Sequence, residues 1–224
     1  VLANAKHFPG HGDTDQDSHK TLPTISFNEK RIDSVELYPY KKLFKEGISS
    51  VMVAHLKVPS LEPSGYPSSL SKPIVTDLLK ESLGFQGLIF TDALTMKGAA
   101  DFKEIGAIDL AAFKAGNDVM LMSENVTIGI SKIIDAYYTG EISEERLELS
   151  VKKILQAKYK VGLNNYKPIE VDNLLQDLNR LKDDVLYEDL IESAITIVKN
   201  NNSLLPIRQL ETKTIAYVQM GDDD

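Results

Sequence analysis

The chain has 224 residues, of which 42% are hydrophobic, 33 are acidic and 25 are basic, giving a formal net charge of −8. This size and apolar content suffice for one large globular domain, or for one domain and part of a second. The acidic balance excludes nucleic acid as the main partner, and no apolar run approaches the roughly 20 residues of a membrane span.

Apolar strands alternate with polar loops and amphipathic helices through the first two thirds of the chain. Residues 1–5 predict a strand that enters a loop rich in histidine and glycine. A helix is predicted over residues 28–46, with a break or kink at Pro39. Its residues expected to face the core are Ile32, Val35, Leu43 and Phe44.

Three more strands follow, separated by helices. Short apolar runs predict strands at residues 49–54, 87–90 and 118–122. Helical spacing predicts helices at about residues 72–83 and 105–115 between them. Because nearly continuous apolar strands with intervening helices are typical of a covered parallel sheet, we expect an α/β fold, either a β/α barrel or a doubly wound sheet.

The remainder of the chain is predicted to be mainly helical. Two helices are expected between residues 127 and 163, the second beginning after a capping signal at Ser143. Residues 164–172 are polar and contain proline, as is typical of a linker. Helical periodicity then returns over residues 174–199, and a strand-like run occupies residues 214–218.

This organisation predicts two domains. Residues 1–163 are expected to form part of a catalytic β/α domain. Residues 164–224 are expected to form a linker and the beginning of a second α/β domain. We interpret the sequence as a segment of a longer protein, because Val1 starts within an apolar pattern and the second domain stops before it is complete.

The densest group of chemically active side chains is in residues 6–19, which contain three of the four histidines. Gly10 and Gly12 allow the backbone to fold tightly around a ligand. The spacing of Asp17 and His19 allows the carboxylate to orient the imidazole for general acid–base chemistry. The same pair is also common in polar turns, so both interpretations stay open here.

Polar residues also follow the predicted strands, where side chains of a parallel sheet face one ligand-binding edge. Asp92 follows the third strand and is a candidate nucleophile. His55 follows the second strand, and Lys6 and His7 follow the first. The alternatives are that Asp92 caps the next helix and that His55 is a hydrogen-bonded structural residue.

A metal site is the nearest alternative for the histidine-rich segment, although the absence of cysteine excludes thiolate ligands. The possible ligands are His7, His11, Asp13, Asp15, Asp17 and His19. An EF-hand starting at Asp13 does not fit, because Ser18 and Thr24 replace its glycine and glutamate. Neither a zinc-protease helix motif nor a nucleotide-binding motif occurs, and we expect no metal and no cofactor.

Three motifs together resemble the signatures of glycoside hydrolase family 3, and within it the β-N-acetylglucosaminidase branch. They are residues 6–14, residues 17–19 and residues 91–96, with residues 115–118 as a further match. The resemblance implies the C-terminal half of a TIM-type (β/α)8 barrel and the start of an αβα sandwich domain. It also implies that the N-terminal half of the barrel lies outside this sequence.

The implied reaction is retaining hydrolysis of terminal, non-reducing β-linked N-acetylglucosamine from cell-wall or chitin-like saccharides. Asp92 corresponds to the nucleophile, His19 to the acid–base group and Asp17 to its partner, while Lys6 and His7 correspond to a sugar-binding pair. The candidate residues are Asp92, His19 and Asp17 for catalysis, and Lys6, His7 and His55 for binding substrate.

Other functions are compatible with the same sequence. A β-glucosidase or xylosidase of this family is the nearest one, although the motif at residues 17–19 favours the acetamido-sugar branch. A metal-dependent barrel hydrolase and a catalytically silent sugar-binding relative are the alternatives from other classes. The expected partner is a small saccharide, and the second domain favours a periplasmic or extracellular location.

Overall fold

The computed structural model describes residues 1–14, 16–18, 20–216 and 218. The chain divides into two compact units, Val1–Tyr166 and the residues from Lys167 onward. The first unit contains the sheet and all the residues considered for the active site.

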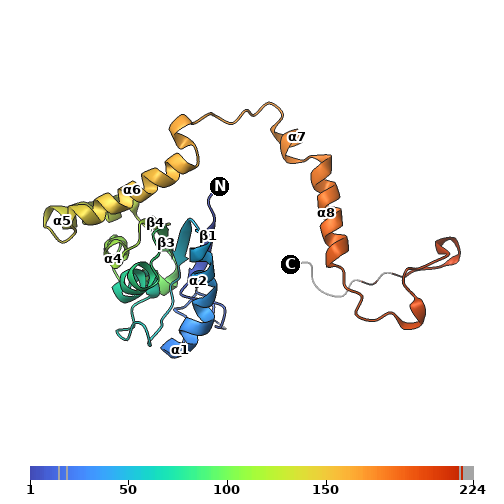
Figure 1. Cartoon of the computed structure of the whole chain (residues 1–224), viewed down its shortest axis with the longest axis horizontal. Coiled ribbons are helices and arrows are strands. Elements are labelled where there is room, and N and C mark those ends of the chain that lie inside the picture. Colours follow the sequence, from blue (N-terminus) through green and yellow to red (C-terminus); the bar gives the residue numbers. More distant parts are fainter. Residues whose placement is uncertain (15, 19, 217, 219–224) are drawn as a thin grey trace. The chain divides into compact units, whose positions relative to one another are not determined.

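A four-stranded parallel sheet forms the centre of the first unit (Figure 1). Its strands pair in chain order, so that β1 and β4 are the two edges of the sheet. The strands are β1 (Asn4–Phe8), β2 (Ser50–Val53), β3 (Leu88–Ala93) and β4 (Val119–Leu121). The expected α/β class with a parallel sheet is confirmed.

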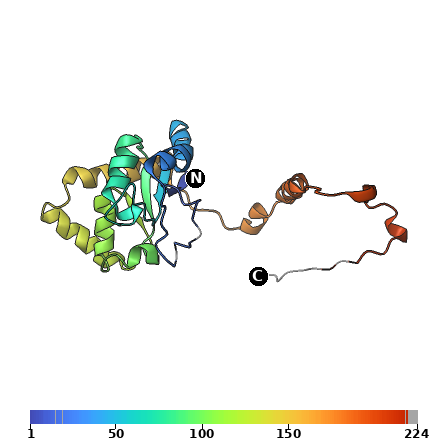
Figure 2. The same ribbon diagram turned by 90° about the horizontal axis from the view of Figure 1, so that it is seen from below.

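Helical segments connect consecutive strands, and Figure 2 shows the strands lying among them. Those between β1 and β2 are α1 (Glu29–Arg31), η1 (Ile32–Glu36) and α2 (Tyr38–Lys45). Those between β2 and β3 are η2 (Ser68–Leu70) and η3 (Pro73–Ser82). Those between β3 and β4 are α3 (Lys97–Ala100) and α4 (Ala107–Ala115). After β4 come α5 (Val126–Tyr138), α6 (Glu144–Lys160) and η4 (Leu163–Asn165).

Local sequence signals explain several helix ends. Ser143 caps α6, because its side chain accepts a hydrogen bond from the backbone N–H of Arg146 at 3.2 Å, as predicted. Pro39 lies at the start of α2, where its missing N–H costs no helical hydrogen bond. Gly47 follows α2 with a φ of +76°, a conformation that glycine adopts without strain.

The main hydrophobic core lies between the sheet and the first helical segments. Val51 and Val53 of β2, Ile89 of β3, and Ile74 and Leu79 of η3 are fully buried in it. All three strand residues belong to predicted apolar runs. Burial of such side chains contributes about 1.5 to 3 kcal/mol each, so this core fixes the positions of the strand ends.

Two details of the first strand–helix unit differ from the prediction. The first strand begins at Asn4 rather than Val1, because Asn4 and Ala5 are its first residues to pair with β2, and it includes Lys6 and His7. Val35 and Leu43 are 49% and 38% exposed rather than buried in the core. The reason is that η1 has π-helical hydrogen bonds, which change the angular spacing assumed for an α-helix.

The second unit contains short helical segments and exposed side chains. They are α7 (Leu174–Leu178), α8 (Leu181–Ala194), η5 (Asn201–Ser203) and η6 (Leu210–Thr212). The strand expected over residues 214–218 is absent from residues 214–216 and 218, which pair with no other strand, and Tyr217 lies outside the described residues. Among the described helices of the chain, none has both the length and the apolar character needed to span a membrane.

Candidate active site

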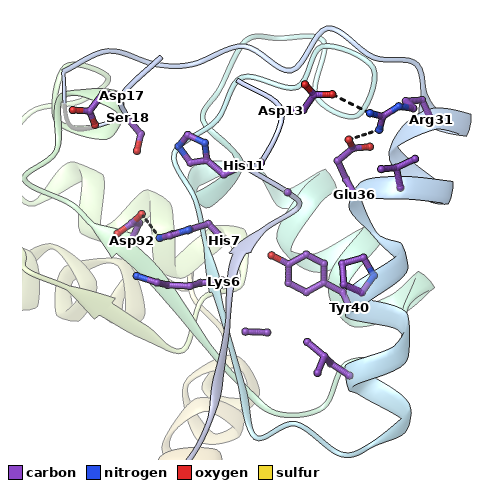
Figure 3. Close-up of a pocket in the computed structure, with 16 residues that line it drawn as sticks. Lys6, His7, His11, Asp13, Asp17, Ser18, Arg31, Glu36, Tyr40 and Asp92 are labelled. Carbon is purple, nitrogen blue, oxygen red and sulfur yellow. Dashed lines mark hydrogen bonds and ion pairs between the residues drawn. The ribbon is translucent and has the colours of Figure 1, made fainter. Parts of the chain in front are cut away.

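A pocket of about 1010 Å³ opens beside the carboxyl ends of β1 and β3 (Figure 3). One side of it carries Lys6 and His7 of β1 and Asp92 of β3. The opposite side is formed by η1 and α2. The loop after β1 completes the lining with His11, Asp13, Asp17 and Ser18. The pocket therefore brings together four of the six candidate site residues, namely Lys6, His7, Asp17 and Asp92.

Asp92 is held at the end of β3 with its carboxylate facing the pocket. Its Oδ1 accepts a hydrogen bond from the backbone N–H of Ala93 at 2.9 Å, and its Oδ2 lies 3.7 Å from Nε2 of His7. The side chain is 14% exposed, and Figure 3 shows it pointing toward His7. Asp92 does not cap the next helix, because the residue at the N-terminal cap of α3 is Met96.

Lys6 and His7 both reach the pocket although they are neighbours in one strand. A regular strand points successive side chains to opposite faces. The pairing of β1 with β2 shifts register between Ala5 and Phe8, so this alternation is broken where the two residues lie. The rings of His7 and His11 then meet edge to face, with 5.9 Å between their centres.

The loop after β1 is fixed against η1 at its beginning. Gly10 has a φ of +144°, and a Cβ atom there would lie 2.6 Å from Cβ of Glu36, so no other residue fits without displacement. Arg31 donates hydrogen bonds to Asp13, at 2.9 Å, and to Glu36 (Figure 3). These contacts set the path along which the loop crosses the pocket.

Asp17 lies further along the same loop and lines the pocket. Its backbone carbonyl accepts hydrogen bonds from the N–H groups of Lys20 and Thr21, at 3.0 and 3.1 Å, which form a tight turn. Ser18 is buried beside it. His19 and Asp15 lie outside the described residues, so the role of His19 stays a prediction from its motif.

His55 does not face the pocket, and this part of the prediction is wrong. Its side chain is fully buried, with Nδ1 2.7 Å from Oγ of Ser69 and Nε2 2.9 Å from the carbonyl oxygen of Ala93. Burial lowers the pKa of the His55 imidazole. The chain after β2 turns inward, and Ala54 and Leu56 on either side of His55 are also fully buried.

The opposite side of the pocket, which carries Arg31, Glu36 and Tyr40, was not among the predicted site residues. The Glu36 side chain is only 7% exposed, and its Oε2 has no hydrogen-bond partner within the described residues. Burial raises the pKa of Tyr40 above its ordinary range. A usable signal was present, because Glu36 lies four residues from both Ile32 and Tyr40, which are buried.

Two of the possible metal ligands of the histidine-rich segment, Asp15 and His19, lie outside the described residues. Among residues 1–14, 16–18, 20–216 and 218, no three His, Asp or Glu side chains gather in a way that could hold a metal ion. Asp13 of the histidine-rich segment pairs with Arg31 instead.

Residues 1–157 match the family model described as the glycosyl hydrolase family 3 N terminal domain. Beta-hexosaminidase A of Pseudoalteromonas piscicida is 31% identical over 242 residues, covering 99% of this chain and 40% of that protein. A protein of Cellulomonas fimi named beta-N-acetylglucosaminidase/beta-glucosidase is 27% identical over 227 residues, covering 97% of this chain and 40% of that protein.

A solved structure is similar as well. The glycoside hydrolase family 3 beta-N-acetylglucosaminidase from Paenibacillus sp. str. FPU-7 superimposes with a TM-score of 0.73 and 35% sequence identity. The match covers 77% of this chain and 33% of that one. The chain thus spans 40% or less of the length of these three similar proteins.

Proposed function

This chain belongs to glycosyl hydrolase family 3, and on that premise we propose that it carries the catalytic groups of a β-N-acetylglucosaminidase. The observation that supports the proposal most is the carboxylate of Asp92 at the end of β3, facing the pocket with Oδ2 3.7 Å from Nε2 of His7. The carboxyl ends of parallel strands are the usual place for catalytic residues in β/α folds.

In the proposed reaction, Asp92 attacks the anomeric carbon of the terminal sugar and forms a covalent glycosyl-enzyme. His19 protonates the glycosidic oxygen as the bond to the leaving group breaks, and Asp17 orients its imidazole. The neutral imidazole then removes a proton from water, which releases the sugar with its β configuration retained. The position of Asp17 on the lining of the same pocket as Asp92 supports this pairing.

An imidazole suits this acid–base role because of the nucleophile beside it. Two carboxyl groups about 5 Å apart are usual in retaining glycosidases, and each anion then disfavours ionisation of the other. A histidine adds no second anion near Asp92. Lys6 and His7, which line the pocket on the same side as Asp92, are proposed to donate hydrogen bonds to sugar hydroxyl groups.

The substrate class is proposed from the motif and from the similar proteins. The names of those proteins include hexosaminidase and N-acetylglucosaminidase activities, and one also includes β-glucosidase. The motif at residues 17–19 favours the acetamido sugar, so a glucoside is the second candidate. We also propose cell-wall or chitin-like saccharides as the source of the terminal sugar.

The proposed enzyme is longer than this chain. The four parallel strands are proposed to be the C-terminal half of an eight-stranded barrel, with residues 1–163 as its catalytic part. Residues 164–224 are proposed to link this part to a second α/β domain. The share of the similar proteins that the chain covers supports this organisation.

Trapping of the nucleophile tests the proposal in the intact protein. A fluorinated N-acetylglucosaminide with an activated leaving group should label the enzyme, and peptide mass spectrometry should locate the sugar on Asp92. Hydrolysis of an aryl N-acetyl-β-glucosaminide should exceed that of the matching aryl β-glucoside. Labelling of a different residue, or faster hydrolysis of the glucoside, would overturn the assignment.

A further inference from the structure

We infer that His55 is a positioning residue for Asp92: oriented by Ser69, it holds the carbonyl group of Ala93, and the N–H of the same residue fixes one carboxylate oxygen of Asp92. This inference rests on the proposed role of Asp92 as nucleophile. It gives His55 a task that requires no contact with substrate.

The hydrogen bonds of His55 define which ring nitrogen carries the proton. The carbonyl oxygen of Ala93 can only accept, so Nε2, 2.9 Å away, is the donor. In the neutral ring Nδ1 then accepts, and the hydroxyl of Ser69, 2.7 Å away, donates to it. Full burial favours this neutral form because it penalises the charged one.

Ser69 is itself held in place from two directions. Its backbone N–H donates to the carbonyl oxygen of Ala54, at 3.2 Å, which ties it to the end of β2. Its carbonyl oxygen accepts a hydrogen bond of 2.7 Å from the side-chain amide of Asn117, which is fully buried before β4. The hydroxyl that orients His55 is therefore part of a fixed network rather than a free rotor.

The end of β3 needs such support because its regular pairing with β4 breaks there. The register shifts between Phe90 and Ala93, and the side chain of Thr91 accepts the N–H of Leu121 at 3.0 Å within this interval. At Ala93 the carbonyl oxygen accepts from both His55 and the N–H of Met96, at 2.9 and 3.0 Å. Side-chain hydrogen bonds thus replace part of the ladder around Asp92.

The backbone of Ala93, held in this way at its carbonyl group, contacts the proposed nucleophile through its N–H. The N–H of Ala93 donates to Oδ1 of Asp92, which leaves Oδ2 on the side of His7 and the pocket. Misplacement of a reacting atom by about 1 Å can cost on the order of 100-fold in rate. Loss of the His55 bond is therefore expected to slow attack by Asp92 while leaving the sugar-binding groups in place.

The serine pair of η2 offers a matched test in the intact protein. Ser68 and Ser69 are both fully buried, and the hydroxyl of Ser68 donates to the carbonyl oxygen of Leu56 at 2.9 Å, away from Asp92. Ser69→Ala should lower the rate of labelling by the fluorinated substrate about tenfold, with KM for an activated aryl glycoside unchanged. Ser68→Ala should lose similar thermal stability and change the labelling rate less than about twofold.

Substitution of His55 itself provides the rescue experiment. His55→Gln keeps a donor and an acceptor on the side chain and should retain more activity than His55→Leu, which keeps neither. Circular dichroism first establishes that the two variants are folded to the same extent. A faster labelling rate in His55→Gln than in His55→Leu would then support positioning by hydrogen bonds. Equal rates in these two folded variants would overturn it.

The outcomes separate this inference from the proposed function. If the unsubstituted protein is labelled at Asp92 but the Ser69→Ala and Ser68→Ala variants react at equal rates, the positioning role is wrong and the nucleophile stands. If the unsubstituted protein is labelled at another residue, the assignment of Asp92 fails first, and the positioning role falls with it.

Discussion

Asp92 and Asp118 lie at opposite ends of the same parallel sheet and have very different surroundings. Asp92 is at the carboxyl end of β3, where its side chain is 14% exposed and faces the pocket. Asp118 precedes β4 at the amino end, where its side chain is 1% exposed. Its Oδ2 accepts hydrogen bonds from the N–H of Ile89 and from Lys153, at 3.1 and 3.3 Å.

The difference shows how one residue type serves two purposes in a fold. The carboxylate of Asp118 also accepts from Ser150 and lies 3.7 Å from Arg146, so two residues of α6 besides Lys153 contact it. A buried anion with this many partners anchors a helix to a sheet. Asp92 is held by the backbone on one side, and its other oxygen lies beside the pocket, as a nucleophile requires.

The largest effect is expected from Asp92→Asn. Hydrolysis of an aryl N-acetyl-β-glucosaminide should fall on the order of 1000-fold, because an amide is a very weak nucleophile. The free energy of unfolding should change by less than about 1 kcal/mol, since Asn retains the hydrogen bond with Ala93. Urea unfolding measures the free energy of unfolding, and initial rates measure hydrolysis. A stable variant that keeps substantial activity would contradict the catalytic role proposed for Asp92.

His19→Ala tests the acid–base role proposed for His19 beside Asp92. Glycosides with poor leaving groups depend on protonation of the departing oxygen, and their hydrolysis should slow about 100-fold. Activated aryl glycosides leave without this help, so their first step should slow far less. Steady-state rates over a series of leaving groups measure the contrast, and equal losses across the series would exclude the acid role.

At the other end of the sheet, Asp118→Asn is expected to act on stability. Removal of the anion leaves Arg146 and Lys153 without their buried counter-charge, so the free energy of unfolding should fall by about 3 kcal/mol. The kcat per folded molecule should stay near that of the parent protein. Thermal unfolding measures the stability, and active-site titration gives the kcat per folded molecule. A large loss of kcat in fully folded Asp118→Asn would contradict a purely structural role for Asp118.

A smaller effect on stability is expected from substitution of Lys80, which lies near Arg146 and Asp118. Burial, with the neighbouring charge of Arg146, lowers the pKa of Lys80 from 10.5 to about 8. Between these pH values the unfolded state binds more protons than the folded state, so stability rises with pH across that window. Lys80→Met should therefore stabilise the protein by about 2 kcal/mol at pH 7, with the gain shrinking toward pH 10. Urea unfolding from pH 7 to 10 measures this trend, which a constant difference would contradict.

The sheet and the position of Asp92 were predictable because both depend on local patterns. Apolar runs predicted the β2 and β3 strands, and the residue after such a run in a parallel sheet lies at the ligand-binding edge. Ser143 was likewise predictable as a helix cap from the acidic residues that follow it. These features need no knowledge of contacts between distant residues.

The errors arose where distant contacts or unusual backbone geometry decide the outcome. His55 is buried through bonds to Ser69 and Ala93, which lie 14 and 38 residues further along the chain. Val35 lies on the pocket rather than in the core because η1 does not follow the spacing of an α-helix. Neither the partner choice of a buried histidine nor a π-helical turn has a dependable signal in a single sequence.

The two edge strands of the sheet have a practical consequence for expression of this chain by itself. In the sheet as described, β1 and β4 each have only one neighbouring strand. The backbone groups along their outer sides are templates on which a foreign strand can add. Separate molecules of this chain are therefore expected to associate through β1 and β4, and a longer polypeptide with strands that pair with β1 and β4 would suppress that association.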